Sequence, residues 1–305
     1  MYAPINGTKI FFDIDGLEYE AAGKVMRQKP VCFILHGGPG DDHTSYLPAL
    51  DPLREYMQLV YIDFRGSGRS ACPDERGYII EQNVLDIEAL RNYLGLEKIA
   101  LFGQSYGGIA AQAYGVKYPD KLSFLILLTT ASNYRVFEKA REELRKRGTP
   151  EQIAMAEKYL WPGAFPDNET YLEFYRAFAS LYTLKPVNMK AFDEAMSRAA
   201  LSYRAFNRGF GGDLQTFDFN KDLHKIACPT LLIGAQEDWI CPVACTEETG
   251  GLIPNCRTVI IRHSGHIVLG DQYEKTMDAV VSFIRAVTAA ENTNLTFPPL
   301  EDHNR

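Results

Sequence analysis

The sequence lacks the features that mark membrane proteins and nucleic-acid-binding proteins. No stretch of its 305 residues approaches the roughly 18 consecutive apolar residues that cross a bilayer. Residues 1–7 carry no basic region and no long apolar run, so we predict no signal peptide. The formal net charge is −7, which argues against nucleic acid or an anionic membrane as the main partner. A small molecule remains as the expected partner.

Cysteine and histidine spacings that bind metals or form disulfide frameworks are also missing. None of the six cysteines stands in a Cys-x-x-Cys spacing, and several fall in predicted strands. Scattered cysteines are typical of reduced thiols in a cytoplasmic protein. No recognised metal-binding spacing and no phosphate- or dinucleotide-binding glycine motif occurs. We therefore predict a cytoplasmic protein with no metal and no cofactor, and the oligomeric state stays open.

Apolar segments alternate between strand-like and helix-like patterns, which predicts an α/β fold. Buried-strand patterns occur at residues 31–35, 59–62, 98–102, 124–128, 229–234 and 258–261. Helical patterns occur at residues 84–94, 109–116 and 273–289. This alternation predicts a mostly parallel central sheet with helices on both faces. Residues 9–14 and 17–25 are expected to form antiparallel strands joined through Asp15-Gly16.

The pattern changes between residues 133 and 222. This segment is rich in charged and aromatic residues, and prolines cut it into helical pieces. We predict that it is a helical cap inserted into a main domain of residues 1–132 and 223–290, with residues 291–305 as a tail. Most aromatic side chains of the cap are expected to form its own core.

The most informative short motif is Gly-Gln-Ser-Tyr-Gly at residues 103–107. It lies where a predicted strand turns into a helix, which is the setting of a nucleophile elbow. The glycines on either side of Ser105 leave room for a tight turn that exposes its hydroxyl. The N–H groups at the start of the following helix point at negative charge that develops beside the serine. The motif predicts Ser105 as a catalytic nucleophile.

A serine nucleophile needs a base, and the base needs an acid that orients it. In elbow-type hydrolases the acid and then the histidine follow the serine along the chain. The loop after residues 229–234 offers Glu237 and Asp238, of which we prefer Asp238 for its spacing before the next proline. His263 and His266 follow the last strand, and we prefer His266 because the glycine before it permits a tight loop.

Two backbone N–H groups are expected to stabilise the oxyanion of such a reaction. One is that of Tyr106, directly after Ser105. The other is expected from the His-Gly-Gly-Pro-Gly loop at residues 36–40, at Gly38. His36 is expected to brace this loop through hydrogen bonds.

Together with Asp-Phe-Arg-Gly-Ser-Gly-Arg-Ser at residues 63–70, these motifs resemble the α/β-hydrolase superfamily, and within it the proline iminopeptidase branch of serine peptidases. The resemblance covers nearly all of the predicted main domain. It implies the α/β-hydrolase fold and a catalytic triad of Ser105, Asp238 and His266.

That branch holds the amine of its substrate with glutamates, one in the cap and one directly after the triad aspartate. In this chain Trp239 follows Asp238, and residues 207–213 contain no glutamate. The difference favours an amidase, esterase or lactonase that acts on a small neutral substrate with an apolar or aromatic acyl group. The predicted substrate-binding residues are Gly37, Trp239, Tyr159, Trp161 and Phe210.

Two alternatives stay open. One is true proline iminopeptidase action, with Glu237, Glu194 or Asp213 in place of the missing glutamates. The other is a small-molecule receptor that kept the fold and the triad, since a fold does not determine a function. An epoxide hydrolase or a dehalogenase is less favoured, because those enzymes place aspartate where Ser105 stands.

Overall fold

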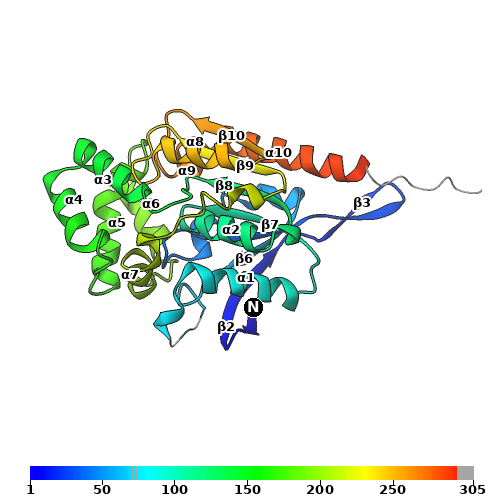
Figure 1. Ribbon diagram of the computed structural model, residues 1–305, viewed down its shortest axis with the longest axis horizontal. Helices are drawn as coiled ribbons and strands as arrows, with labels where there is room; N and C mark the ends of the chain where they lie inside the picture. The colour runs from blue at the N-terminus through cyan, green and yellow to red at the C-terminus, as the bar shows by residue number, and fades with distance from the viewer. Residues whose placement is uncertain (71, 73, 294–305) are drawn as a thin grey trace, which may run out of the picture.

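The other elements of the molecule are arranged around a twisted central sheet (Figure 1). The computed structural model describes residues 1–70, 72 and 74–293. Within these residues the strands of the main sheet are β1 (Tyr2–Ile5), β2 (Thr8–Asp15), β5 (Val31–Leu35), β6 (Gln58–Ile62), β7 (Ile99–Gln104), β8 (Leu122–Leu128), β9 (Thr230–Ala235) and β10 (Cys256–Ile261). Their order is β1-β2-β6-β5-β7-β8-β9-β10. β2 pairs antiparallel with β1 and β6, and all other pairs are parallel.

Helices cover both faces of this sheet. Outside the cap they are α1 (Ile80–Tyr93), α2 (Tyr106–Lys117), α8 (Val243–Leu252), α9 (Val268–Asp271) and α10 (Tyr273–Thr293). Phe33 and Leu35 of β5 share one apolar core with α1, α2 and α8. Cys32 and Ile34 point to the opposite face and share a second core with α10. The predicted α/β-hydrolase fold, with a mostly parallel sheet between two helical layers, is therefore confirmed.

Between β8 and β9 the chain leaves the sheet and forms the helical cap. Its helices are α3 (Val136–Arg147), α4 (Pro150–Met155), α5 (Asn168–Tyr182), α6 (Met189–Met196) and α7 (Tyr203–Phe210), and a π-helical segment η5 (Ala156–Leu160) continues α4. In Figure 1 the green cap helices gather at one end of the sheet, and β3 projects at the other. As predicted, many cap aromatic side chains pack on one another in a buried core: Phe165, Tyr171, Phe174, Phe178 and Phe206.

Local sequence signals explain where the cap helices begin. Thr149 and Gln152 form a capping box at the start of α4, with Pro150 at its first position. Asp167, directly before α5, accepts a hydrogen bond from the backbone N–H of Thr170. These caps satisfy N–H groups that the first helical turn leaves without partners.

Short 3-10 helices join several elements. They are η1 (His43–Tyr46), η2 (Asp51–Glu55), η3 (Glu75–Gly77), η4 (Pro119–Lys121), η6 (Asp213–Gln215) and η7 (Leu223–Lys225). Among all helices in the described part of the chain, none combines the length and the apolarity that crossing a membrane requires.

The N-terminal hairpin differs from the prediction. β2 forms its hairpin with β1, through a turn at Asn6 and Gly7 in which both residues have positive φ, 47° and 73°. Asn-Gly is the favoured pair for such a two-residue turn. Residues 17–25 do not pair with β2. Instead β3 (Tyr19–Ala22) and β4 (Val25–Gln28) form a separate two-stranded sheet.

Helix α2 starts unusually close to the sheet because glycines stand at the contact. A Cβ atom on Gly107 would lie 2.1 Å from the carbonyl oxygen of Leu35, and one on Gly108 would lie 2.7 Å from Thr130. Both distances are well below van der Waals contact, so any larger residue would displace the helix. The glycines thus allow the start of α2 to lie against the ends of β5 and β8.

We expect Gly107→Ala to lower the free energy of unfolding by at least about 2 kcal/mol, because overpacking against backbone that cannot move is costly. Gly251→Ala in α8 is the matched control, since nothing lies within 4 Å of the added methyl group. The control is expected to be neutral or to stabilise by about 0.5 kcal/mol. Equilibrium urea unfolding measures both changes, and equal effects would contradict the account.

Candidate active site

Ser105 occupies a strained turn between β7 and α2. Its φ of 54° and ψ of −121° lie in a region that residues with a side chain rarely adopt. The surroundings hold it there. The Ser105 N–H donates to the carbonyl of Leu128 at 3.0 Å, and the Ser105 carbonyl accepts from the Thr130 hydroxyl at 2.8 Å. The chain therefore forms the predicted elbow conformation.

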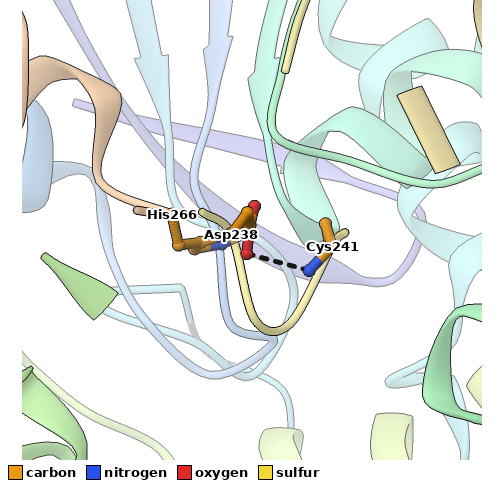
Figure 2. Close-up of side chains that lie close together, drawn as sticks. All are labelled: Asp238, Cys241 and His266. Carbon is orange, nitrogen blue, oxygen red and sulfur yellow. Dashed lines mark hydrogen bonds and ion pairs between the residues drawn. The ribbon is translucent and has the colours of Figure 1, made fainter. Parts of the chain in front are cut away.

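Asp238 and His266 form a buried hydrogen-bonded pair. The imidazole Nδ1 of His266 lies 2.7 Å from Oδ2 of Asp238. The other oxygen, Oδ1, accepts from the backbone N–H groups of Ile240 at 2.9 Å and Cys241 at 3.0 Å, the second of which is the dashed line in Figure 2. Because the carboxylate accepts a hydrogen bond from Nδ1–H, the proton stays on Nδ1, and Nε2 of His266 is left as the basic nitrogen.

The loop that carries His266 is fixed from several sides. The His266 carbonyl accepts from Gln104 Nε2 at 3.0 Å and from the Thr129 hydroxyl at 3.1 Å. The backbone N–H of Gly265 donates to Asp271 at 2.8 Å. These contacts hold the imidazole in place without using its ring nitrogens.

The other candidates for acid and base lie apart from this pair. Glu237 accepts a hydrogen bond from the backbone N–H of Ser264 at 3.0 Å, so it supports the histidine loop rather than the imidazole. His263 is exposed. The structure thus brings together Asp238 and His266, the two residues that the sequence favoured.

Cys241 adds a third donor group near the pair. The ligand atoms of Asp238, Cys241 and His266 all lie within 4.8 Å of one another (Figure 2). Both carboxylate oxygens already accept hydrogen bonds from the protein. Burial also raises the pKa of the Cys241 thiol well above its usual value, which disfavours the thiolate that a metal would need. The arrangement therefore fits an acid–histidine pair better than a metal centre.

The loop at residues 36–40 is braced by His36, as predicted. Nε2 of His36 accepts from the backbone N–H of Phe64 at 2.9 Å, so Nδ1 carries the proton and donates to the Gly37 carbonyl at 2.8 Å. Burial lowers the pKa of this histidine and keeps it neutral. Gly38 has a φ of 99°. A Cβ atom there would lie 2.9 Å from two backbone nitrogens, so glycine is required.

One pocket joins these elements. It has a volume of about 340 Å³, and its wall includes Gly37, Gly38, Ser105 and His266. Cap side chains complete the wall: Tyr175, Tyr182, Val187, Phe192, Phe206 and Phe210. A mostly apolar wall with a few polar groups is typical of small-molecule sites. Tyr106 begins α2 beside the pocket, and its buried hydroxyl accepts from Asn83 Nδ2 at 2.8 Å.

A larger hollow, of about 1240 Å³, lies at the other end of the sheet. Charged and polar side chains of the β3–β4 hairpin and α10 surround it, among them Glu18, Lys29 and Arg285. None of the predicted site residues lines it. We therefore place the chemistry in the smaller pocket.

Three of the five predicted substrate-binding residues lie outside the wall of the smaller pocket. Trp239 is completely buried, and its ring packs on Phe178 with centroids 5.5 Å apart. Trp161 packs against Trp239 at 6.3 Å, and Tyr159 stacks on Phe165 at 5.6 Å. These large rings gain more contact inside the aromatic core than at the pocket surface. The prediction for Trp239, Tyr159 and Trp161 is corrected accordingly, whereas Gly37 and Phe210 do line the pocket.

Asp41, which the sequence motifs do not single out, also lines the pocket. Its Oδ1 accepts from the hydroxyl of Tyr175 at 2.8 Å and lies 3.3 Å from that of Tyr171. Burial raises the pKa of Asp41 to about 6. An acidic residue directly after the glycine loop was the available signal, but the sequence did not show that the cap places two tyrosines beside it.

Comparison with known proteins agrees with this fold. Residues 30–273 match the family described as alpha/beta hydrolase fold. The proline iminopeptidase PfmaB of Pestalotiopsis fici is 29% identical, over 93% of this chain and 98% of that protein. A proline iminopeptidase of Lactobacillus helveticus is 30% identical, over 70% of this chain and 76% of that one. The crystal structure of a proline iminopeptidase of Mycobacterium smegmatis superposes with a TM-score of 0.76 at 19% identity, covering 95% of this chain and 99% of that one.

The chain belongs to the α/β-hydrolase fold family, and its relatives place it in the proline iminopeptidase-like branch. It is an enzyme, a hydrolase.

The corrected pocket wall makes a prediction. Phe192→Ala removes a half-buried ring from the wall and is expected to raise KM for an apolar substrate about three- to tenfold. Trp239→Phe instead changes the packing of the main domain against the aromatic core of the cap. It is expected to lower the free energy of unfolding by about 1 to 2 kcal/mol and to leave KM within about twofold. Steady-state kinetics with one aryl ester, together with urea unfolding, compare the two. A raised KM in Trp239→Phe together with an unchanged KM in Phe192→Ala would show that Trp239 contacts the substrate.

Proposed function

We propose that this hydrolase cleaves an amide or ester bond of a small substrate with Ser105 as nucleophile, His266 as base and Asp238 as the acid that orients it. The observation that carries the proposal is the Asp238–His266 pair, bonded at 2.7 Å, whose imidazole lines the same pocket as the strained Ser105. A nucleophile, a base and an orienting acid are the parts that acyl transfer to serine requires.

The reaction follows from these roles. Nε2 of His266 takes the proton of the Ser105 hydroxyl while Oγ attacks the carbonyl carbon, and the imidazolium is stabilised by Asp238. The backbone N–H groups of Gly38 and Tyr106 are the proposed donors to the oxyanion. The imidazolium then gives its proton to the leaving amine or alcohol. Water then attacks the acyl-enzyme by the same steps, and the carboxylic acid product is released.

The pocket supports a small organic substrate. Its wall is mostly apolar, and its volume of about 340 Å³ is near the lower end of ordinary ligand sites. We propose an apolar or aromatic acyl group for this space. We further propose that the enzyme works in the cytoplasm, and that neither nucleic acid nor a membrane is its partner, in keeping with its six free cysteines and net negative charge.

Proline iminopeptidase action is the second candidate, supported by the names of the relatives. The three acidic residues that the sequence offered as amine ligands do not line the pocket. Asp213 accepts from the backbone N–H of Ile80 at 2.6 Å, and Glu194 is exposed on α6. Under this candidate the amine requires another partner.

Ser105→Ala is expected to lower kcat for an aryl ester about 10⁴- to 10⁶-fold, because it removes the nucleophile, while Tm changes by less than about 2 °C. Asp238→Asn is expected to lower kcat about 10³- to 10⁴-fold, because the carboxylate that orients the imidazole is lost. The exposed Ser282→Ala on α10 is the control and is expected to behave as wild type. Substantial turnover by Ser105→Ala would rule out the proposed nucleophile.

A further inference from the structure

A carboxylate that the proposed mechanism does not use lies beside the nucleophile. Asp41 directly follows the glycine loop and lines the same pocket as Ser105 and His266. A Cβ atom built on Gly37 would lie 3.8 Å from Oδ2 of Asp41 and 3.7 Å from Cβ of Ser105. The carboxylate and the nucleophile therefore flank the same point of the loop.

The hydrogen bonds of Asp41 leave one oxygen available. Both tyrosine contacts go to Oδ1, from Tyr175 at 2.8 Å and Tyr171 at 3.3 Å. The hydroxyl of Tyr171 also lies 3.1 Å from the carbonyl of Pro39. Because it has one proton, it donates to only one of these two acceptors at a time. Among the described residues, none donates a hydrogen bond to Oδ2. Oδ2 is the oxygen that would lie 3.8 Å from a Cβ atom built on Gly37, the point of the loop that Ser105 also approaches.

Asp41 also has no cationic partner. In the part of the chain that the structure describes, no lysine, arginine or histidine nitrogen forms an ion pair with its carboxylate. The neighbouring Asp42, by contrast, pairs with Arg69 at 3.0 Å. Burial raises the pKa of Asp41 to about 6, so the group is mostly anionic near neutral pH. An anion in apolar surroundings without a counter-ion is costly, and a cation from a ligand relieves that cost.

We infer that the otherwise apolar acyl group of the substrate carries a protonated amine next to the scissile carbonyl, and that Asp41 binds this amine. The inference rests on the proposed function, because it takes Ser105 as the point of attack. The rings of Tyr175 and Tyr182 in the same wall offer further contact to a cation. Asp41 is thus a specificity residue that directly follows the glycine loop of the main domain and is oriented by α5 of the cap.

Two substrates that differ only in the amine test this role. The alanyl and propionyl p-nitroanilides have acyl groups of similar size, and the ratio of their kcat/KM values measures the preference for the amine. Asp41→Asn is expected to lower this ratio about 10- to 100-fold, because a charged hydrogen bond is lost. The control is Glu173→Gln, an exposed residue on α5 that removes the same charge, and it is expected to keep the ratio within about twofold. An unchanged ratio in Asp41→Asn overturns the inference.

A third substrate, the lactyl anilide, has a hydroxyl in place of the amine. It shows whether Asp41 requires a positively charged group or only a hydrogen-bond donor. Wild type is expected to prefer the alanyl over the lactyl substrate at least about tenfold. Equal kcat/KM values would overturn the assignment of a cation. Where Asp41→Asn does not fold, Tyr175→Phe serves instead. It removes a donor to Oδ1, and it is expected to lower the ratio about three- to tenfold.

Direct binding separates failure of this inference from failure of the proposed function. Alaninamide titrated into Ser105→Ala by calorimetry requires no catalysis. Adding Asp41→Asn is expected to weaken its binding at least about tenfold. If Asp41→Asn weakens binding but Ser105→Ala still turns over substrate, the amine subsite is supported and Ser105 is not the nucleophile. Unchanged binding would refute the subsite and leave the nucleophile intact.

The pH dependence gives a further readout. The titratable groups that face Asp41 are Tyr171, Tyr175 and Tyr182 of α5, Tyr46 of η1, Asp42 and His266. As the pH falls below about 6, protonation of Asp41 removes the anion, so the alanyl-to-propionyl ratio is expected to fall. The two substrates share the same proposed base and nucleophile, so effects of pH on the shared chemical steps cancel in the ratio. A ratio that falls equally in Asp41→Asn would contradict the assignment.

Discussion

The strained conformation of Ser105 is the constraint on which the site depends. A residue with a side chain at φ 54° and ψ −121° persists only where the surroundings determine it. Gly103, Gly107 and Gly108 provide those surroundings, because a Cβ atom on any of them would meet neighbouring atoms at 2.7 Å or less. The strand, the turn and α2 thereby form one rigid unit. That unit presents the serine hydroxyl at the end of the sheet, where the loops after β5, β9 and β10 also meet.

The cap contributes to the site by holding these loops as well as by covering them. Helix α5 ends at Tyr182, whose carbonyl accepts from the backbone N–H of Ile267 at 3.0 Å, next to His266. Tyr171 of the same helix contacts the Pro39 carbonyl at 3.1 Å. The carboxylate of Asp271 accepts from Gly265 on one side and from Leu184 on the other. One helix therefore positions both the histidine loop and the glycine loop, so changes in the cap are transmitted to the reacting groups.

The elements that local patterns specify were predictable. Apolar runs gave the parallel strands, and the glycine spacing around Ser105 gave the elbow. The order of residues along the chain then left two candidates for the acid, Glu237 and Asp238, and two for the base, His263 and His266. The preferred candidates, Asp238 and His266, are hydrogen-bonded to each other in the structure. The pocket wall depends on how the cap packs, which periodicity does not encode. For that reason Trp239 was placed in the pocket, although it is completely buried, and Asp41 was overlooked.

The site combines a mostly apolar wall with one carboxylate whose second oxygen is available, beside a nucleophile that the backbone holds in place. The most direct test of the central claim is mass spectrometry of the enzyme quenched in acid during turnover of an aryl ester whose acyl-enzyme hydrolyses slowly. If Ser105 is the nucleophile, one acyl group per chain is expected on the peptide that contains Ser105, and no adduct is expected in Ser105→Ala. An acyl group on another residue, or turnover with no covalent adduct at any time, would contradict it.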